Sequence, residues 1–316
     1  MSTTFHNCWY LTGATAVGKT AVGIALAERL GAEIVSLDSM AIYRGMDIGT
    51  AKPSAAERAA VPHHLVDIVD PVDEFSVAQY VEAAGKAVEG IRVRGREVLF
   101  VGGTSLYLKS LLRGLFEGPP ADWKLREEIE QELELVGQQA LYQRLRQVDP
   151  VAAANIHPRD TRRLIRALEV YRATGEPISH QQLQFEEGRP AEECRVFVLR
   201  RTREELHARI EARVNGMIAA GLVDEVRKLT AGGRQLGRTA RQAVGYREAL
   251  DHLAGELNHA EMVEQIKFRS RRFAKRQGTW FRSLSECRFV DIAGEVDADA
   301  VATAIALQAA PSSAGG

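Results

Sequence analysis

The amino-acid sequence predicts an α/β protein, with a mainly parallel sheet flanked by helices and with an all-helical insertion domain. Two observations lead to this prediction. Up to Leu112, apolar runs typical of buried strands alternate with helical patterns, as in parallel strands joined by crossover helices. From Trp123 to Thr174, by contrast, helical patterns follow one another and no strand signal is present.

The stretch around which the chain is organised is a glycine-rich loop. Cys8–Leu11 is predicted as a buried strand and Ala21–Leu30 as a helix that ends at Gly31. Between them lies the P-loop pattern, Gly13-Ala14-Thr15-Ala16-Val17-Gly18-Lys19-Thr20. Backbone N–H groups, the helix N-terminus and Lys19 can surround a phosphate, and Thr20 can reach a phosphate or a metal-bound water. We therefore expect a P-loop NTPase-like core that binds a diphosphate or triphosphate. The alternative is a strand-to-helix turn that matches by chance.

The other elements before the insertion continue the alternation. Asp38 and Ser39 stand at the carboxyl end of the second predicted strand, where ligands bind in open α/β sheets. The run from Asp38 to Pro53 is expected to form a structured loop over the site. Ser76 is the expected N-cap of a helix to about Val93. Strands are predicted at 33–37, 63–69 and 97–101, and a further helix at 106–112.

After Gly118-Pro119-Pro120 the sequence predicts the insertion and then the second half of the core. Helices are expected at about 123–136, 138–148 and 160–174, with Gly175 as a stop signal for the last. Strands at 195–199 and 288–291 and helices at 203–220, 222–230, 261–281 and 296–307 follow. The expected division is 1–117 and 195–308 for the two parts of the core, 118–194 for the insertion and 309–316 for a disordered tail.

The bulk composition excludes several classes of protein. The apolar fraction of 45% and the charged fraction of 26% are those of a globular protein, and the net charge of −1 does not by itself indicate a polyanionic partner. Three distant cysteines, Cys8, Cys194 and Cys287, suggest neither a disulfide framework nor a zinc site. Because no signal peptide and no apolar stretch of about 18 residues is present, we expect a cytoplasmic protein without a membrane span.

Residues at two predicted strand ends are candidates for chemistry. Asp38, beside the P-loop, is expected either to hold Mg²⁺ through water or to act as a general base, and an N-cap or a turn aspartate is the alternative. Gly102 and Gly103 follow a strand and permit close approach of a ligand. Thr104 then offers a hydroxyl and a helix N-terminal amide. An ordinary N-cap is the alternative for Thr104, and both roles are compatible.

Two basic segments are candidates for binding a polyanion. The first is a set of four arginines with the spacing of one helix face, Arg159, Arg162, Arg163 and Arg166. Four like charges there favour an anionic partner, and a solvated face partnered by Asp160 and Glu169 is the alternative. The second is the run 269–282, in which basic residues interleave with aromatic ones. The basic residues suit contacts to phosphates, and the aromatic rings suit packing or stacking on bases. A solvated basic helix is the alternative. Together with the P-loop, these segments favour an enzyme with a phosphorylated small substrate and a nucleic-acid substrate.

The chain resembles the tRNA dimethylallyltransferase family, whose members prenylate an adenine in the tRNA anticodon loop. The matching stretches run in order over nearly the whole chain, at 13–20, 38–39, 43–53, 101–107, 157–160, 166–170, 242–246 and 275–280. The run Met46–Pro53, MDIGTAKP, is far more specific than the P-loop alone. One departure is Ala14, where many members have proline. Without the C-terminal zinc finger of eukaryotic members, the chain is similar to the bacterial type.

The resemblance implies a reaction and roles for individual residues. A dimethylallyl group would pass from dimethylallyl diphosphate to N6 of the adenine just 3′ of the anticodon. The P-loop with Arg213 would then hold the diphosphate, with Mg²⁺ bound at Thr20, directly or through water. Asp38 would accept the amine proton, with Lys19 and Thr104 also catalytic. The residues implied on the side of the tRNA anticodon stem-loop are Asp38, Ser39, Met40, Ala41, Thr104, Arg126, Arg162, Arg163, Leu164, Ile165, Arg166, Gln242, Ala243, Val244, Gly245, Tyr246 and Arg247. A monomer is expected.

Two other classes of function remain open on the residues alone. A P-loop small-molecule kinase or ATPase would use the arginine face 159–166 as a lid over the phosphates of a nucleotide. A non-catalytic RNA-binding NTPase switch is the other. Stabilisation by dimethylallyl diphosphate but not by ATP, in the presence of Mg²⁺, separates the transferase from the kinase.

Overall fold

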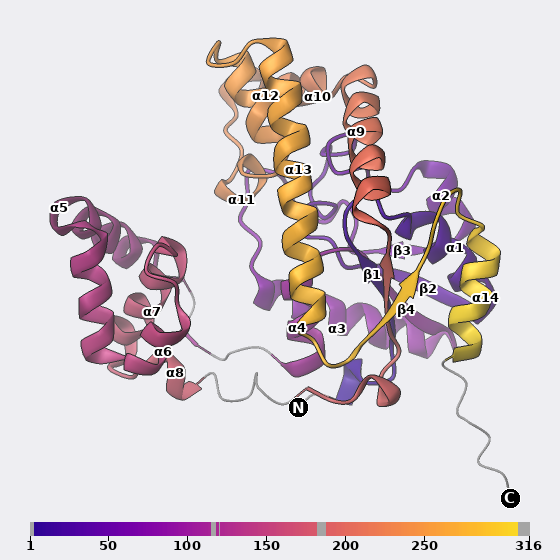
Figure 1. Ribbon diagram of the computed structural model, residues 1–316, viewed down its shortest axis with the longest axis horizontal. Helices are drawn as coiled ribbons and strands as arrows, with labels where there is room; N and C mark the ends of the chain where they lie inside the picture. Colours follow the sequence, from indigo (N-terminus) through magenta and orange to yellow (C-terminus); the bar gives the residue numbers. More distant parts are fainter. Residues whose placement is uncertain (1–2, 115–117, 120, 182–187, 309–316) are drawn as a thin grey trace, which may run out of the picture. The chain divides into compact units, whose positions relative to one another are not determined.

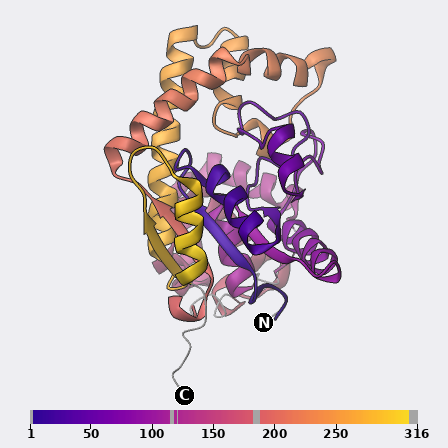
Figure 2. The same ribbon diagram turned by 90° about the vertical axis from the view of Figure 1, so that its right-hand side faces the viewer.

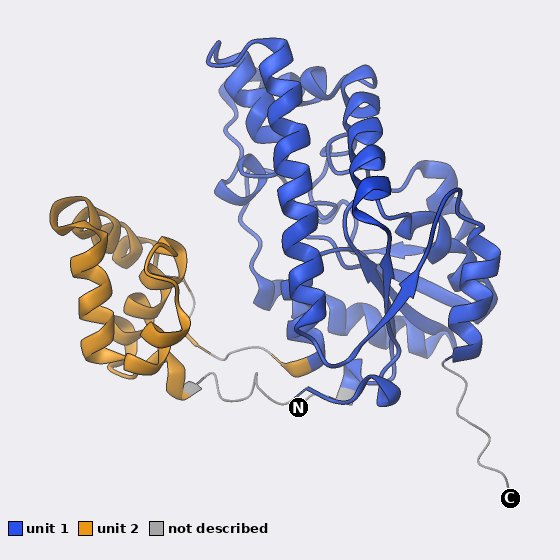
Figure 3. Ribbon diagram, in the orientation of Figure 1, with its two compact units in different colours: residues 1–112, 188–316 blue, residues 113–187 orange. Residues whose placement is uncertain are grey.

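The computed structural model describes residues 3–114, 118–119, 121–181 and 188–308. The chain forms two compact units, residues 1–112 with 188–316 and residues 113–187 (Figure 3). The second unit overlaps most of the stretch 118–194 where the insertion is expected, but it begins at 113 and ends at 187. The expected disordered tail, 309–316, lies outside the described residues.

A six-stranded sheet forms the centre of the first unit, and every neighbouring pair of its strands is parallel (Figure 1). The predicted mainly parallel sheet is therefore confirmed. The glycine-rich loop leaves the sheet from a central strand, because β1 lies between β4 and β5. In spatial order the strands are β3 (His63–His64), β2 (Ala32–Ser36), β4 (Glu97–Val101), β1 (Trp9–Gly13), β5 (Val196–Arg200) and β6 (Cys287–Asp291).

Helices cover both faces of the sheet, as the alternation of strands and helices requires (Figure 2). Side chains of successive strand residues point to opposite faces. On one face Leu11 and Phe197 pack with helices α1 (Lys19–Leu30) and α14 (Ala298–Gln308). On the other face Tyr10 and Phe100 pack with α3 (Val77–Val93), α4 (Ser105–Arg113) and the C-terminal end of α13 (His259–Arg282). The strands are thus buried on both sides.

A third apolar cluster lies away from the sheet, on the far side of the ligand cavity that is described below. Long helices α9 (Arg203–Ala219) and α13 frame this cluster, and they extend together beyond the sheet in Figure 1. Shorter helices complete it, namely α10 (Leu222–Leu229), α11 (Arg238–Arg241) and α12 (Tyr246–Leu253), and the exposed η4 (Ala231–Gly233) follows α10. Ile42, Tyr43 and Met46, from the loop after β2, are fully buried in the same cluster. The loop is therefore a packed part of the core.

The second unit is all-helical over its described residues. Its helices are α5 (Trp123–Val148), α6 (Pro150–Asn155), α7 (Thr161–Thr174) and α8 (Ile178–Gln181). Gly137, with φ 79°, interrupts α5 at the boundary between the two helices that the sequence predicts there. α7 ends at Gly175 in the left-handed conformation, as expected. Ile129, Leu141, Leu164 and further apolar residues form a core within this unit.

Two differences from the expected elements have local physical causes. The strand expected at 63–69 is only two residues long, because Leu65 and Asp67 have positive φ values of 59° and 58°, which a strand does not tolerate. Helix α2 (Ala55–Ala60) was not predicted, although Ser54 and Glu57 form a capping box at its start. Helices α6, α8, α11 and α12 and the short helices η1 (Thr3–Phe5) and η3 (Ala191–Glu193) also lacked a prediction. No helix within the described ranges is both long and apolar enough to cross a membrane.

Candidate functional site

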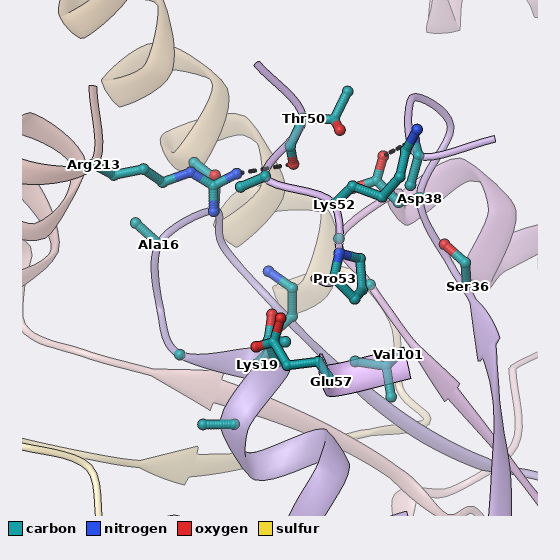
Figure 4. Close-up of a pocket in the computed structure, with 18 of the residues that line it drawn as sticks. Ala16, Lys19, Ser36, Asp38, Thr50, Lys52, Pro53, Glu57, Val101 and Arg213 are labelled. Carbon is teal, nitrogen blue, oxygen red and sulfur yellow. Dashed lines mark hydrogen bonds between the residues drawn. The ribbon is translucent and has the colours of Figure 1, made fainter. Parts of the chain in front are cut away.

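A cavity of about 530 Å³ opens at the carboxyl ends of β1, β2 and β4, within the first unit (Figure 4). Segments that are far apart in the sequence form its walls, namely the glycine-rich loop, the end of β2, the loop before α2, the end of β4, and helices α9 and α13. Its polar and charged lining includes Thr15, Lys19, Thr20, Ser36, Asp38, Thr50, Lys52, Glu57, His63, Arg209, Arg213 and Gln277. The position agrees with the general rule for ligand sites in parallel sheets.

The glycine-rich loop joins β1 to α1 as predicted. Lys19 is the first residue of α1, and its ammonium donates hydrogen bonds to the carbonyl oxygens of Gly13 (3.1 Å) and Ala14 (2.8 Å). The Nε atoms of two arginines hold the next carbonyl oxygens, that of Ala16 from Arg209 (2.8 Å) and that of Val17 from Arg201 (3.0 Å). Cationic side chains therefore fix four carbonyl groups of the loop, and two of them, Lys19 and Arg209, also line the cavity where an anion would lie.

Gln277, on α13, ties the loop to the end of β4. Its side-chain oxygen accepts a hydrogen bond from Thr15 N (2.9 Å), and its side-chain nitrogen donates to Gly103 O (2.7 Å). The side chain is only 4% exposed. Gln277 belongs to the basic and aromatic run 269–282 and to the matching stretch 275–280. Its role depends on two partners in other elements, which no local pattern reveals.

The electrostatics of the cavity favour an anionic ligand. Burial lowers the pKa of Lys19 to about 8, and the positive charge of Arg213 acts in the same direction, whereas Asp38 raises it. Burial also lowers the pKa of Arg213, which lies on α9 and donates from Nη2 to Thr50 O (3.1 Å). Two cations are therefore held near each other in a site that disfavours their charge. A bound anion would relieve both penalties.

Asp38 lies directly after β2 and lines the cavity (Figure 4). Its Oδ1 accepts hydrogen bonds from Met40 N (2.8 Å) and Ala41 N (3.3 Å), which form an aspartate turn and fix the carboxylate. The turn that the sequence offers as an alternative role is thus present. It engages one oxygen, and the carboxylate remains in the cavity wall, so both roles are compatible.

Thr104 connects the end of β4 to the residues after β2. Its hydroxyl oxygen accepts a hydrogen bond from Ser39 N (3.0 Å), and its own N–H donates to Leu37 O (3.0 Å). Gly102 and Gly103 both line the cavity, so each lies where a ligand could approach. A Cβ atom at Gly102 would also lie 2.2 Å from Leu37 O, so the neighbouring strand end requires glycine there as well.

The oxygen donors in the cavity fit a hydrated Mg²⁺. Thr20, the second residue of α1, and Asp38 both line it. Mg²⁺ usually keeps several waters and is held by one or two protein oxygens together with substrate phosphates. Among the described residues, no group of three or more His, Cys, Asp or Glu side chains is placed to hold a metal ion. The donor set therefore suits a metal that arrives with a phosphate-containing substrate.

The segment 242–247, expected on the tRNA side, is largely part of the core. Tyr246 is fully buried and Ala243 is 8% exposed, and both belong to the third apolar cluster. Tyr246 donates its hydroxyl hydrogen to Glu225. Gly245 N donates to Glu248. Ala243, Gly245 and Tyr246 are thus buried, whereas Gln242 and Arg247 are exposed and Val244 is half-buried.

The residues expected to contact tRNA from the second unit differ in the same way. Leu164 and Ile165 are buried in the unit's own core. The buried carboxylate of Glu169 accepts hydrogen bonds from Arg126 Nε (2.8 Å) and Arg166 Nη1 (2.9 Å). It therefore joins Arg126 on α5 to Arg166 on α7, and for Arg166 this is the carboxylate partner named in the alternative.

The four arginines do not form one helix face. Arg159 precedes α7, which begins at Thr161. Arg162 and Arg163 are exposed in the first turn of α7, and Arg163 pairs with the N-cap Asp160 (3.3 Å). Positive charge is unfavourable at a helix N-terminus, where anions are stabilised. Two arginines at this place are thus explained better by an anionic partner than by the stability of the helix.

The fold and the site define a parallel α/β protein with a loop of the P-loop form and a cationic cavity that contains a carboxylate. The model of one family, IPP transferase, matches residues 41–284. The chain belongs to the IPP transferase family, whose enzymes are prenyltransferases.

Relatives and solved structures cover nearly all of the chain. It is 51% identical to the tRNA dimethylallyltransferase of Rhodopirellula baltica, over 90% of this chain and 87% of the relative, and 48% identical to that of Geobacter metallireducens, over 90% and 92%. The crystal structure of the tRNA isopentenylpyrophosphate transferase of Bacillus halodurans has a TM-score of 0.69 at 39% identity and covers 96% of this chain and 97% of that one. A eukaryotic dimethylallyltransferase acting on tRNA has a TM-score of 0.73 at 28% identity, over 90% and 73%.

Proposed function

We propose that this enzyme transfers a dimethylallyl group from dimethylallyl diphosphate to N6 of the adenine just 3′ of the anticodon in tRNA. The observation that carries the proposal is one cavity that combines Lys19, Arg213 and the loop with the carboxylate of Asp38. Relatives that are about half identical bear the name tRNA dimethylallyltransferase, which supports both substrates. The activity would be cytoplasmic, with a monomer acting on the anticodon stem-loop.

The cationic end of the cavity suits the leaving group. As N6 attacks C1 of the allyl group, the bond from C1 to the bridging oxygen breaks and diphosphate leaves with increased negative charge. Lys19, Arg213 and the N-terminus of α1 interact most strongly with this charge in the transition state, which is the condition for catalysis. Mg²⁺ held at Thr20, when bound, would add positive charge to the departing diphosphate.

Asp38 suits the role of proton acceptor. An exocyclic amine is a weak nucleophile, and it must lose one proton when it forms the new C–N bond. The aspartate turn with Met40 and Ala41 fixes the carboxylate at the end of β2 in the cavity wall. A carboxylate in that position can take the proton from N6 as the bond forms. The adenine must leave its stack to reach it, so a flipped base is expected.

A direct assay tests the proposal. Unmodified tRNA is incubated with the enzyme, Mg²⁺ and labelled dimethylallyl diphosphate, and the nucleosides are analysed after digestion. We expect one labelled product, N6-dimethylallyladenosine, at the position 3′ of the anticodon. Label in another nucleoside, or no transfer to tRNA by a folded enzyme that binds the donor, would contradict the proposal.

The exposed arginines of α7 give a prediction about tRNA binding. Replacing Arg162 and Arg163 together by alanine should weaken tRNA binding and flatten its salt dependence, because each lost phosphate contact reduces the log–log slope by roughly 0.7 to 0.9. Binding of dimethylallyl diphosphate should be unchanged. Arg146→Ala, an exposed arginine on α5 of the same unit, is the matched control. An unchanged slope in the double variant would mean that these arginines contact only solvent and their own unit.

Thr104→Ala separates catalysis from capping. The hydroxyl of Thr104 holds Ser39 N, next to Asp38, and we propose that it also lies beside the bridging oxygen of the diphosphate. Turnover should fall on the order of tenfold or more, with a smaller effect on tRNA affinity, since one positioned donor typically contributes this much or more. The measurements are single-turnover transfer and tRNA binding. A variant that loses only thermal stability would reduce Thr104 to a structural cap.

A further inference from the structure

One carboxylate outside the cavity holds the loop 46–53, which forms a cavity wall through Thr50, Ala51, Lys52 and Pro53. Glu225, in the first turn of α10, accepts hydrogen bonds from three consecutive backbone N–H groups, those of residues 47 (3.0 Å), 48 (2.8 Å) and 49 (3.3 Å). Its Oε1 also accepts from the hydroxyl of Tyr246. A carboxylate offers about four acceptor positions, so these four donors use the whole group.

The shape of the loop also depends on close packing at Gly49, against Tyr246, which donates to Glu225. A Cβ atom at Gly49 would lie 2.4 Å from Cε2 of Tyr246 and 2.9 Å from Cδ1 of Leu222, so only glycine allows the backbone to pass there. Burial and the hydrogen bond to Glu225 raise the pKa of the Tyr246 hydroxyl far above its ordinary value. The hydroxyl therefore stays protonated and donates. The loop is therefore held by the close packing of Gly49 against Tyr246 and Leu222 and by three backbone hydrogen bonds to the carboxylate of Glu225.

The next residue of the loop meets the cationic end of the cavity. Thr50 O accepts the hydrogen bond from Arg213 Nη2 (3.1 Å), and both residues line the cavity (Figure 4). The ammonium of Lys52, whose side chain is 2% exposed, pairs with Asp47 and Asp67 at 2.6 Å each and closes the loop on itself. A displacement of residues 47–49 would thus be passed directly to the carbonyl that orients Arg213.

We propose that Glu225 is a positioning residue for Arg213, and through it for the diphosphate of the donor. The carboxylate on α10 sets the loop, the loop sets the carbonyl of Thr50, and this carbonyl aims the guanidinium on α9 into the cavity. The inference deepens the proposed function and rests on it in one respect, that the cavity holds a diphosphate. Tyr246 assists by occupying the fourth acceptor position of Glu225.

The first test compares donor binding and transfer in two neighbouring variants. Glu225→Gln replaces an acceptor with an NH₂ group that faces backbone donors, so the loop must shift. Affinity for dimethylallyl diphosphate, measured by calorimetry, should fall about tenfold or more, and transfer on the order of 10²-fold, the effect of a small misplacement. Affinity for tRNA should be unchanged. Asp224→Asn, which also removes one negative charge from the first turn of α10, should behave as wild type.

The second test asks whether the effect passes through Arg213. In the background of Arg213→Ala, Glu225→Gln should cause little further loss of donor affinity, because the group that it positions is gone. Equal losses with and without Arg213 would overturn the proposal, as would unchanged donor affinity in folded Glu225→Gln. Tyr246→Phe is the milder variant in case Glu225→Gln does not fold, and its smaller loss should vanish in the same background. Failure of the wild-type enzyme to bind the donor would instead contradict the proposed function.

Discussion

Asp38→Asn should slow prenyl transfer by about 10²- to 10⁴-fold, the usual contribution of a positioned general base. Asparagine keeps a side-chain oxygen that can accept from Met40 N and Ala41 N, so the aspartate turn and the end of β2 should persist. It cannot accept the proton of the amine. Binding of tRNA and of dimethylallyl diphosphate should therefore remain close to that of wild type, and the loss should appear in the chemical step.

Single-turnover transfer from preformed complexes is the measurement for Asp38→Asn. It excludes product release, which can hide a loss in the chemical step. Asp38→Glu is the matched variant, because it retains a carboxylate but moves it by one methylene, and its rate should lie between those of wild type and Asp38→Asn. Single-turnover rates of Asp38→Asn near wild type would remove Asp38 from the mechanism and leave it as a turn residue.

Lys19→Ala is expected to lower transfer by roughly 10²- to 10³-fold, the range measured when one preorganised charge-stabilising group is removed. In the proposed reaction Lys19 would face a diphosphate whose charge grows as the allylic bond breaks, so turnover should fall more than donor affinity. The ammonium also holds the carbonyl groups of Gly13 and Ala14. Lys86→Ala, an exposed lysine on α3, is the control and should behave as wild type.

The same variant separates the proposed transferase from a kinase. Wild type and Lys19→Ala are assayed with tRNA and Mg²⁺, with either dimethylallyl diphosphate or ATP as the donor. The transferase needs no ATP, and only the allylic donor should give product. Prenylation that depends on added ATP, or a phosphorylated product without prenylated adenine, would contradict the proposed transfer reaction.

Local signals explain what the sequence predicts well. The loop 13–20 is recognised because its glycines, its lysine and its place between a strand and a helix are all local in the chain. Ser76 and Gly175 mark helix ends for the same reason, since caps act within one turn. Asp38 is found because the carboxyl end of a parallel strand can be inferred from the alternation of strands and helices.

Features that the sequence does not predict depend on partners distant in the chain. The spacing places Arg166 on one helix face with three other arginines, but Pro119 O, 47 residues earlier, also accepts a hydrogen bond from its guanidinium. Leu164 and Ile165 lie between two matching stretches, and their burial follows from helices α5 and α6 packing on α7. The resemblance implies that Tyr246 lies on the tRNA side, whereas in the structure its ring is buried and its hydroxyl donates to Glu225.

The sequence by itself determined the parallel α/β core, the phosphate-type loop, the helical insertion and the family resemblance. Each of them depends on local patterns, that is, on residues that are close to one another in the chain. Only the tertiary structure decided which of the marked side chains face the cavity. Gln277 reaches Thr15, Arg209 reaches Ala16, and Glu225 reaches residues 47–49. These contacts join helices of the second half of the chain to loops of the first. A buried polar group must find a hydrogen-bond partner wherever packing places one, and no spacing along the chain specifies that partner.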